Sequence, residues 1–444
     1  MLETLKNAFK TKEIRVKIFL TLALLLVYRI GCYIPVPGLS ADAIGNIFEE
    51  TSFLSILTSM SGGSLQSATL FSLGILPFIN AFIIMQLLTL VIPKLEKLSK
   101  EGDAGRRKIT QITRYVALVL AAVQGIGIVV GWRSQGAIVN LFSFESSWDA
   151  PYLTMASVII ILMAGSTMVM WLGERITEYG VGNGISMILF AGIVSRGPSV
   201  VLTMWQYLVL GYQGLKAGST GTGLRYMIGI PVLVVIFVIM VGFIVLMTKA
   251  ERRIPIQYAK RVVGRKMYGG QSSYIPVNVN MSGVMPIIFA SSLMAIPGTI
   301  AAFVEPKEGS FWAKFVQIFN YNSGFYAFLY FILIIAFAYF YVAIQYNPVE
   351  MANNLRKNNG AIPGIRPGKP TSDFIARIIS KVTLIGAMFC AVVAILPIGI
   401  AALTGIQGVS LGGTTIIIIV GVALDTVKQL ESEMMMRHYK GFLE

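Results

Sequence analysis

The chain has 444 residues, of which 55% are hydrophobic and 13% are charged, and its mean hydropathy is +0.73. A water-soluble protein cannot bury that share of apolar side chains, so the composition excludes a soluble globular fold. The formal net charge of +15 would suit binding to nucleic acid, unless the basic residues gather on one side of a membrane.

Long apolar segments recur along the whole chain. A helix rises about 1.5 Å per residue, so about 20 apolar residues cross a hydrocarbon layer of about 30 Å. Ten segments meet this requirement: Ile18–Ile34, Leu70–Ile92, Ile109–Trp132, Tyr152–Leu172, Gly184–Leu208, Tyr226–Thr248, Val284–Val304, Phe325–Tyr346, Ile378–Ala402 and Gly412–Val427. Stretches such as Ile416–Val420 are apolar on every side, which is not the strict alternation of a β-barrel strand. The sequence therefore predicts an all-α integral membrane protein with ten transmembrane helices.

The basic residues are distributed unevenly between the two sides of the predicted membrane domain. With the amino terminus inside, 27 Lys and Arg lie in the inner segments and six in the outer loops, leaving out Arg29, Arg114 and Lys381 in or beside spans. The positive-inside rule then predicts that both termini are cytoplasmic. Arg29 lies near the outer end of the first span, where we expect its side chain to reach the interface. No small-residue cleavage pattern follows that span, so we interpret it as a retained helix and not as a signal peptide.

We predict that residues 1–444 form one membrane domain, because no linker divides the apolar segments. The spans fall into two sets of five, residues 18–208 and 226–427, and an odd number makes the second set enter the membrane in the opposite orientation. This arithmetic permits an inverted repeat with a pathway between the halves, although no clear internal similarity in the sequence supports it. The largest polar stretches are two basic inner loops, 249–283 and 347–377.

One outer segment is too short to span the membrane. Residues Thr51–Ser67 read TSFLSILTSMSGGSLQS, with no charge and a break at Gly62-Gly63. One interpretation is an interfacial helix that lies on the membrane. The other is a re-entrant segment that folds back into a cavity of the protein, where non-helical backbone does not meet lipid.

Residues that could support catalysis or metal binding are scarce. The single histidine, His438, lies in a basic tail, and Cys32 and Cys390 lie in separate apolar stretches, where we expect reduced side chains that pack. The carboxylates lie almost entirely in loops, with Glu174 and Asp425 at the inner ends of spans, so no facing acid pair is evident. We therefore expect no enzyme activity, no catalytic residue, no metal site and no cofactor.

A secondary transporter of small solutes with an inverted-repeat fold is the alternative to a channel. Ion-coupled carriers commonly place ionisable residues near the bilayer midplane, whereas these spans offer Arg29 and little else. A carrier that coordinates sodium through unwound backbone does not need such ionisable residues, so their scarcity does not exclude it. The residues alone therefore leave the alternative open.

The chain resembles the bacterial SecY family of protein-conducting channels in five long segments. They are Ser61–Leu88 (SGGSLQSATLFSLGILPFINAFIIMQLL), Glu101–Tyr115 (EGDAGRRKITQITRY), Trp171–Val194 (WLGERITEYGVGNGISMILFAGIV), Glu251–Ser292 (beginning ERRIPIQYAKRVVGRKMYGG) and Asn347–Thr371 (NPVEMANNLRKNNGAIPGIRPGKPT). The resemblance runs in order, with matching span spacing, from about Lys17 to Val427. It implies two inverted five-helix halves that enclose an hourglass pore with a plug and a lateral gate toward lipid.

The resemblance also assigns residues to the pore. The constriction ring would consist of Ile75, Ile79, Ile185, Leu189, Ile288 and Ile418. A narrow apolar ring offers water and ions no hydrogen-bond partner, so it resists leakage. The plug would comprise residues 52–67, including Ser61, Gly62, Gly63 and Ser64.

The lateral gate would lie among the second, third, seventh and eighth spans. Gln86 and Asn183 match polar positions at this gate in the family, where a hydrogen bond across a helix interface closes the gate without locking it. Both residues have an alternative interpretation as ordinary contacts between helices.

The two basic inner loops would form a docking platform for partners. The residues expected there are Arg252, Arg253, Lys260, Arg261, Arg265, Lys266 and Arg366, with Arg106 and Arg107 from a third inner loop. Asn278 departs from some relatives, which carry a lysine at this position. The implied partners are SecE, SecG, the SecA ATPase, the ribosome through its rRNA, signal sequences, unfolded secretory or membrane-protein substrates, and lipid.

The implied function is a passive channel in the bacterial plasma membrane. It would pass unfolded polypeptides across the membrane and release transmembrane segments sideways into lipid. The sequence has no GxxxxGK[ST] loop, so the energy would come from SecA, the ribosome or the proton-motive force.

Overall fold

A computed structural model gives the fold of the chain. It describes residues 9, 11–40, 44, 62–134, 136–139, 150–216, 220–258, 261–263, 266–268, 272–303, 310–319, 323–404 and 413–440. The amino-terminal half contains α2 (Lys12–Gly31), α5 (Leu76–Val91), α6 (Pro93–Lys100), α7 (Asp103–Ser134), α8 (Ala150–Tyr179), α9 (Gly184–Ser195) and α10 (Gly197–Lys216). The carboxy-terminal half contains α11 (Thr220–Lys249), α12 (Met285–Phe303), α13 (Phe311–Ile318), α14 (Gly324–Gln345), α15 (Pro348–Lys357), α16 (Lys369–Thr404) and α17 (Gly413–Lys440).

Each of the ten predicted spans coincides with a helix or a helix pair. Within the described residues, six helical segments are long and apolar enough to cross a membrane, and the bent pair α5 and α6 makes a seventh if it counts as one span. Helix α12 contributes a shorter apolar stretch, Met285–Pro297. The other two spans are α2 and α17, whose apolar stretches continue into charged ends. The prediction of a ten-helix membrane fold is confirmed.

Two predicted spans have different boundaries in the structure. The second span does not begin as a helix at Leu70, because α5 starts only at Leu76, after Gly74 with a φ of +55°. The other end of this span is a bend of 101° between α5, which ends at Val91, and α6, which begins at Pro93. Pro93 lacks a backbone N–H and disfavours helical backbone angles at the preceding residue, so the helix breaks at this proline. The fifth span is likewise two helices, α9 and α10, which meet at Arg196.

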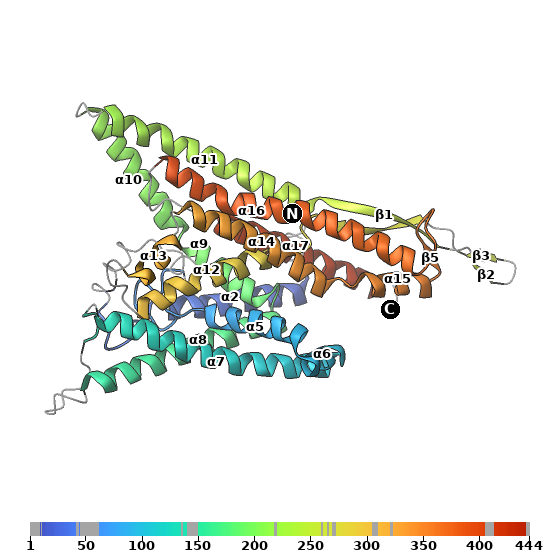
Figure 1. The fold of residues 1–444 in the computed structure, drawn as a ribbon, viewed down its shortest axis with the longest axis horizontal. Coiled ribbons are helices and arrows are strands. Elements are labelled where there is room, and N and C mark those ends of the chain that lie inside the picture. The colour runs from blue at the N-terminus through green and yellow to red at the C-terminus, as the bar shows by residue number, and fades with distance from the viewer. Residues whose placement is uncertain are drawn as a thin grey trace.

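The helices form two groups that face each other along the molecule. In Figure 1, α5, α6, α7 and α8 lie along one side and α11, α14, α16 and α17 along the other, with α2, α9 and α12 between them. Helix α12 packs on α7 and α5, α17 packs on α9, and α11 packs on α10, so the two halves of the chain contact each other through these helices. One buried apolar cluster takes side chains from both groups, including Phe78 of α5 and Phe289 of α12.

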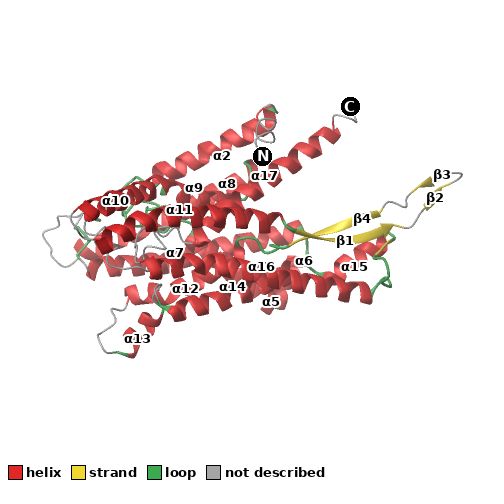
Figure 2. Ribbon diagram, turned by 90° about the horizontal axis from the view of Figure 1, so that it is seen from above, coloured by secondary structure: helices red, strands yellow, loops and turns green. Residues whose placement is uncertain are grey.

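A small β-sheet projects from one end of the helical body (Figure 2). Its order is β4 (Ser272–Asn278), β1 (Glu251–Tyr258) and β5 (Gly360–Ala361), with β1 antiparallel to both neighbours. Two shorter strands, β2 (Arg261–Val263) and β3 (Lys266–Tyr268), pair with each other at the tip. The sequence did not predict these strands, of which β1 to β4 lie in the first basic loop and β5 lies in the second.

The two basic loops form one structural unit. Ile254 and Ile256 on β1 are buried against Leu355 of α15, Ile362 after β5, and Ile375 of α16. Glu251 and Arg253 are exposed on the other face of the strand, whereas Arg252 is exposed on the same face as the isoleucines, at the beginning of the strand. Residues from 249–283 and 347–377 are therefore held together by a shared apolar core.

Candidate functional site

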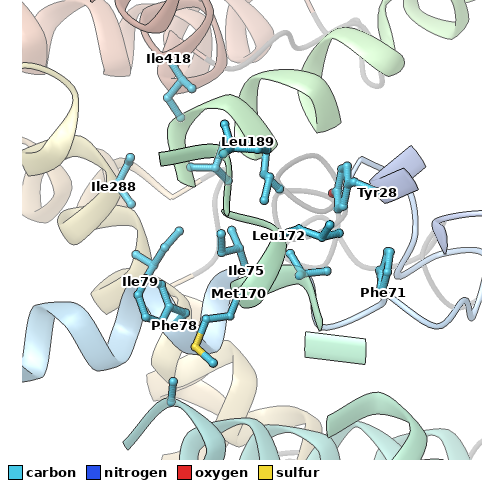
Figure 3. Close-up of a cluster of buried hydrophobic side chains, with 14 of the residues drawn as sticks. Tyr28, Phe71, Ile75, Phe78, Ile79, Met170, Leu172, Leu189, Ile288 and Ile418 are labelled. Carbon is cyan, nitrogen blue, oxygen red and sulfur yellow. The ribbon is translucent and has the colours of Figure 1, made fainter. Parts of the chain in front are cut away.

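The six residues expected in the ring come together in the structure. Five of them are at most 5% exposed and belong to one apolar cluster: Ile75, Ile79, Leu189, Ile288 and Ile418. The sixth, Ile185, is partly buried and packs against the same cluster. Figure 3 shows the five buried side chains converging from α5 and the residue before it, α9, α12 and α17. The collar is therefore dry and drawn from both halves of the molecule.

Helix periodicity and glycine contacts position this collar. Ile75 and Ile79 are four residues apart, as are Ile185 and Leu189, so each pair projects from one face of its segment. A Cβ added at Gly173 of α8 would lie 3.3 Å from the Ile188 side chain and 3.6 Å from the Ile75 side chain. This glycine lets α8 approach α9 and the start of α5 closely enough to fix the collar.

A polar cavity adjoins the collar on the side of the β-sheet. Its volume is about 290 Å³, and Ile288 forms part of its wall. Its polar lining residues are Asn183, Ser186, Thr248, Asn278, Asn280, Ser282, Tyr341, Gln345, Asp425 and Lys428, from both halves of the chain. An apolar constriction therefore opens directly into a chamber that can hold water. The chamber could not be found from the sequence, because its residues are scattered over five separate stretches of the chain.

The segment between α2 and α5 is folded compactly where the structure describes it. Ser61 and residues 52–60 lie outside the described residues, whereas Gly62, Gly63 and Ser64 lie within them. The buried Ser64 hydroxyl donates to the Phe71 carbonyl at 2.9 Å, and the Ser64 carbonyl accepts from the hydroxyls of Thr69 and Ser72. These bonds satisfy polar groups that would otherwise be costly to bury in the membrane.

The two residues expected at the lateral gate make separate contacts. Asn183 is the N-cap of α9, and its Oδ1 accepts from the backbone N–H groups of Ile185 and Ser186 at 3.1 and 3.4 Å. Gln86 lies on α5, and its buried Oε1 has no hydrogen-bond partner in the described part of the chain. The packing of α12 on α7 and α5 forms one contact between the two halves, which we call the seam.

The basic residues expected to dock partners lie at one end of the molecule. Arg252, Arg253, Arg366, Arg106 and Arg107 are exposed. Lys260 and Arg265 lie outside the described residues, and Arg261 and Lys266 lie on β2 and β3, where only the backbone is described.

Two of these arginines are held in place by their surroundings. Arg253 pairs with Glu251 at 2.6 Å, and its guanidinium carbon lies 4.8 Å from the centre of the Tyr274 ring. Arg366 lies in a turn whose glycines, Gly364 and Gly368, have φ values of +81° and +109°. The Arg366 carbonyl accepts a bond from the buried Thr371 hydroxyl at 2.8 Å, which fixes the base of that turn.

We expected the Arg29 side chain to reach the membrane interface, and the structure shows that it also makes hydrogen bonds within the protein. Its Nη1 donates to the carbonyl of Gly62 at 3.3 Å, and its Nη2 donates to the Tyr33 hydroxyl at 2.9 Å. The side chain therefore connects α2 to the segment between the first two spans. A lone charge inside an apolar span was the signal for this contact, because such a charge requires a polar partner.

Comparison with known proteins identifies the family. A profile of the SecY family matches residues 69–427. The protein translocase subunit SecY of Streptomyces scabiei is 41% identical over 452 residues, which cover 100% of both chains.

Two solved structures share the fold. One describes how the plug domain of SecY stabilises the closed state of a translocation channel and maintains a membrane seal (TM-score 0.61, 21% identity). The other is Sec61 in a canine ribosome-channel complex (TM-score 0.60, 21% identity). Each comparison covers 94% of this chain and 92% of the other. The chain therefore belongs to the SecY family of protein-conducting channel subunits.

Proposed function

We propose that the collar of Ile75, Ile79, Ile185, Leu189, Ile288 and Ile418 is the constriction of this protein-conducting channel. The observation that carries the proposal is the burial of five of these side chains in one cluster drawn from both halves. Water and ions find no hydrogen-bond partner in such a collar, whereas aliphatic side chains can rearrange around an unfolded polypeptide. The polar chamber beside Ile288 would keep the polypeptide hydrated up to this point.

Movement of the two halves would open the channel across the membrane and also sideways toward lipid. Separation of α12 from α7 and α5 would expose the pore to lipid, so that an apolar segment can leave sideways. Gln86 fits a role at this seam, because its buried Oε1 would gain partners when the seam becomes hydrated or occupied. Asn183 faces the chamber as well as capping α9, so we propose that it acts at the entrance.

The basic end of the molecule would face the cytoplasm of a bacterium, with both termini on the same side. The 27-to-6 distribution of basic residues supports this orientation in the plasma membrane. The exposed Arg252, Arg253 and Arg366 project from a unit that the apolar core stiffens, which suits docking of the SecA ATPase. A related channel is complexed with a ribosome, and basic loops are suited to contact rRNA phosphates. SecE and SecG would complete the membrane complex.

Ion conductance in planar bilayers tests the collar. We expect that replacing Ile75, Ile79, Ile185 and Ile288 by Ser raises the conductance of the resting channel, because each hydroxyl gives water a partner in the constriction. Ile385→Ser on α16 is the matched control, since this isoleucine is 57% exposed on the outer surface of the described structure. Conductance equal to that of the wild type in the collar variant would refute the assignment.

A further inference from the structure

The turn between α8 and α9 leads directly into the collar. It comprises residues 180–183, and Gly182 within it has a φ of +87°. Asn183 caps α9, and the first turn of that helix carries Ile185. Helix α9 is only 12 residues long and packs on α2, α8 and α17. A displacement of this turn would therefore move Ile185 and, one helical turn later, Leu189.

Threonine hydroxyls from two helices hold the backbone at this turn. Thr21 of α2 accepts a hydrogen bond from the Val181 N–H at 3.0 Å. Thr177 of α8 accepts a hydrogen bond from the Gly184 N–H at 2.9 Å. Each hydroxyl also donates to a carbonyl of its own helix, four residues earlier in the chain. The two threonines thus satisfy backbone donors that would be costly to bury without a partner.

The contact with Thr21 is tightly packed and dry. A Cβ added at Gly180 would lie 2.5 Å from the Thr21 Oγ1 atom, so only a glycine lets the turn approach this hydroxyl. Thr21 and Val181 are both buried. Val181 packs in an apolar cluster with Ile14 of α2 and Leu430 of α17. The turn is therefore held between α2 and α17, and its hydrogen bond to Thr21 lies in surroundings that strengthen it.

We propose that Thr21 is a positioning residue for the constriction, because its hydroxyl holds the turn 180–183 and thereby sets the position of Ile185 on α9. The inference rests on the proposed function and assigns a role to a residue that is not part of the collar. Loss of the bond would loosen the amino-terminal end of α9, whereas α12 and α17 would keep their collar side chains in place.

The rate at which a water-soluble maleimide modifies a collar cysteine tests this role in the complete membrane complex. The probes are Ile185→Cys on α9 and Ile288→Cys on α12, with the native Cys32 and Cys390 changed to alanine. We expect Thr21→Val to raise the rate at position 185 about tenfold, because valine has the same shape but cannot accept the backbone N–H of the turn. The rate at position 288 should stay unchanged.

Four further variants separate the hydrogen bond from a general change in packing. Thr21→Ser keeps the hydroxyl and should leave the rate at position 185 unchanged. Thr113→Val on α7 should also leave it unchanged, because this buried hydroxyl donates to the Ile109 carbonyl at 2.8 Å and accepts no backbone N–H in the described part of the chain. Gly180→Ala should raise the rate, because its Cβ meets the Thr21 hydroxyl. Gly242→Ala on α11 has open space around it and should not.

An unchanged rate at position 185 in Thr21→Val would overturn the proposal, and Gly180→Ala gives the same test should Thr21→Val fail to assemble. An equal rise at positions 185 and 288 would also overturn it, since the whole collar would then have loosened. If the collar variants conduct ions but Thr21→Val leaves the rate at 185 unchanged, the positioning role is wrong and the channel assignment stands. If Thr21→Val raises that rate but the collar variants do not conduct, Thr21 positions α9 and the constriction is wrongly assigned.

Discussion

At the scale of single residues, one buried polar atom lowers the stability of the helix packing around it. Gln86 Oε1 on α5 is buried and has no hydrogen-bond partner among the described residues. An unsatisfied buried polar group costs about 1–3 kcal/mol. The packing around Gln86 is therefore less stable than it would be with an apolar side chain of the same shape.

Replacing Gln86 by Leu should stabilise the closed protein. We expect the free energy of unfolding to rise by about 1 kcal/mol, because leucine has a similar volume and no polar group to satisfy. Thermal unfolding in detergent measures the change. The control is Thr89→Val on the same helix, whose hydroxyl already donates to the Met85 carbonyl at 2.7 Å. A lower unfolding temperature for Gln86→Leu would contradict this account, because it would mean that the amide forms hydrogen bonds that stabilise the folded protein.

At the scale of elements, the β-sheet and its apolar core join the two basic loops into one structural unit. Ile256 is only 3% exposed and lies in the core shared by β1, α15 and α16. The exposed arginines of β1 can therefore be presented in a fixed arrangement, which long basic loops without a core could not provide.

Ile256→Ala should loosen this unit without affecting the helical body. We expect a local loss of about 2–5 kcal/mol, so that trypsin cleaves residues 249–283 faster and SecA-driven transport falls. Gln257→Ala changes the neighbouring exposed side chain and serves as the control. Unchanged cleavage of Ile256→Ala would contradict the idea that the apolar core holds the loops together.

The sequence predicted the helices better than it predicted the loops. Apolar stretches of about 20 residues are unambiguous in a membrane protein, and the ten predicted spans follow from them. The strand β1 alternates only two buried isoleucines with charges and a proline, and its partners lie far along the chain. Such a short non-local pattern is indistinguishable from a basic loop before the fold is known.

The candidate site was predictable only in part from residue patterns. An isoleucine in an apolar helix looks the same whether it faces lipid, the core or a pore, so the collar came from resemblance to the family. The start of α5 at Leu76 and the bond from Arg29 to Gly62 depend on backbone geometry at glycines. Hydropathy does not encode that geometry.

At the scale of the whole molecule, the two halves are joined where α11 packs on α10 and α17 packs on α9, and at two further places. One is the seam of α12 with α7 and α5. The other is an ion pair between Lys17 of α2 and Glu433 of α17, 2.9 Å apart, beside buried Ile14, Val181 and Leu430. In the proposed channel the first of these two contacts would separate for lateral release, whereas the second joins α2 to α17.

Charge reversal tests whether Lys17 and Glu433 hold the halves together. We expect Glu433→Lys to lower the thermal unfolding midpoint, because it places two cations side by side, with an effect of about 1 kcal/mol for a partly exposed pair. The double variant Lys17→Glu with Glu433→Lys should restore most of the loss. If the double variant is no more stable than Glu433→Lys alone, the pair does not contribute to the contact.

Site-specific crosslinking tests most directly whether an unfolded polypeptide passes through the collar. A photo-reactive residue at position 79 or 288 should crosslink to a stalled secretory precursor, and one at the exposed position 385 of α16 should not. Equal crosslinking at all three positions, or crosslinking at 385 alone, would contradict a pathway through the collar.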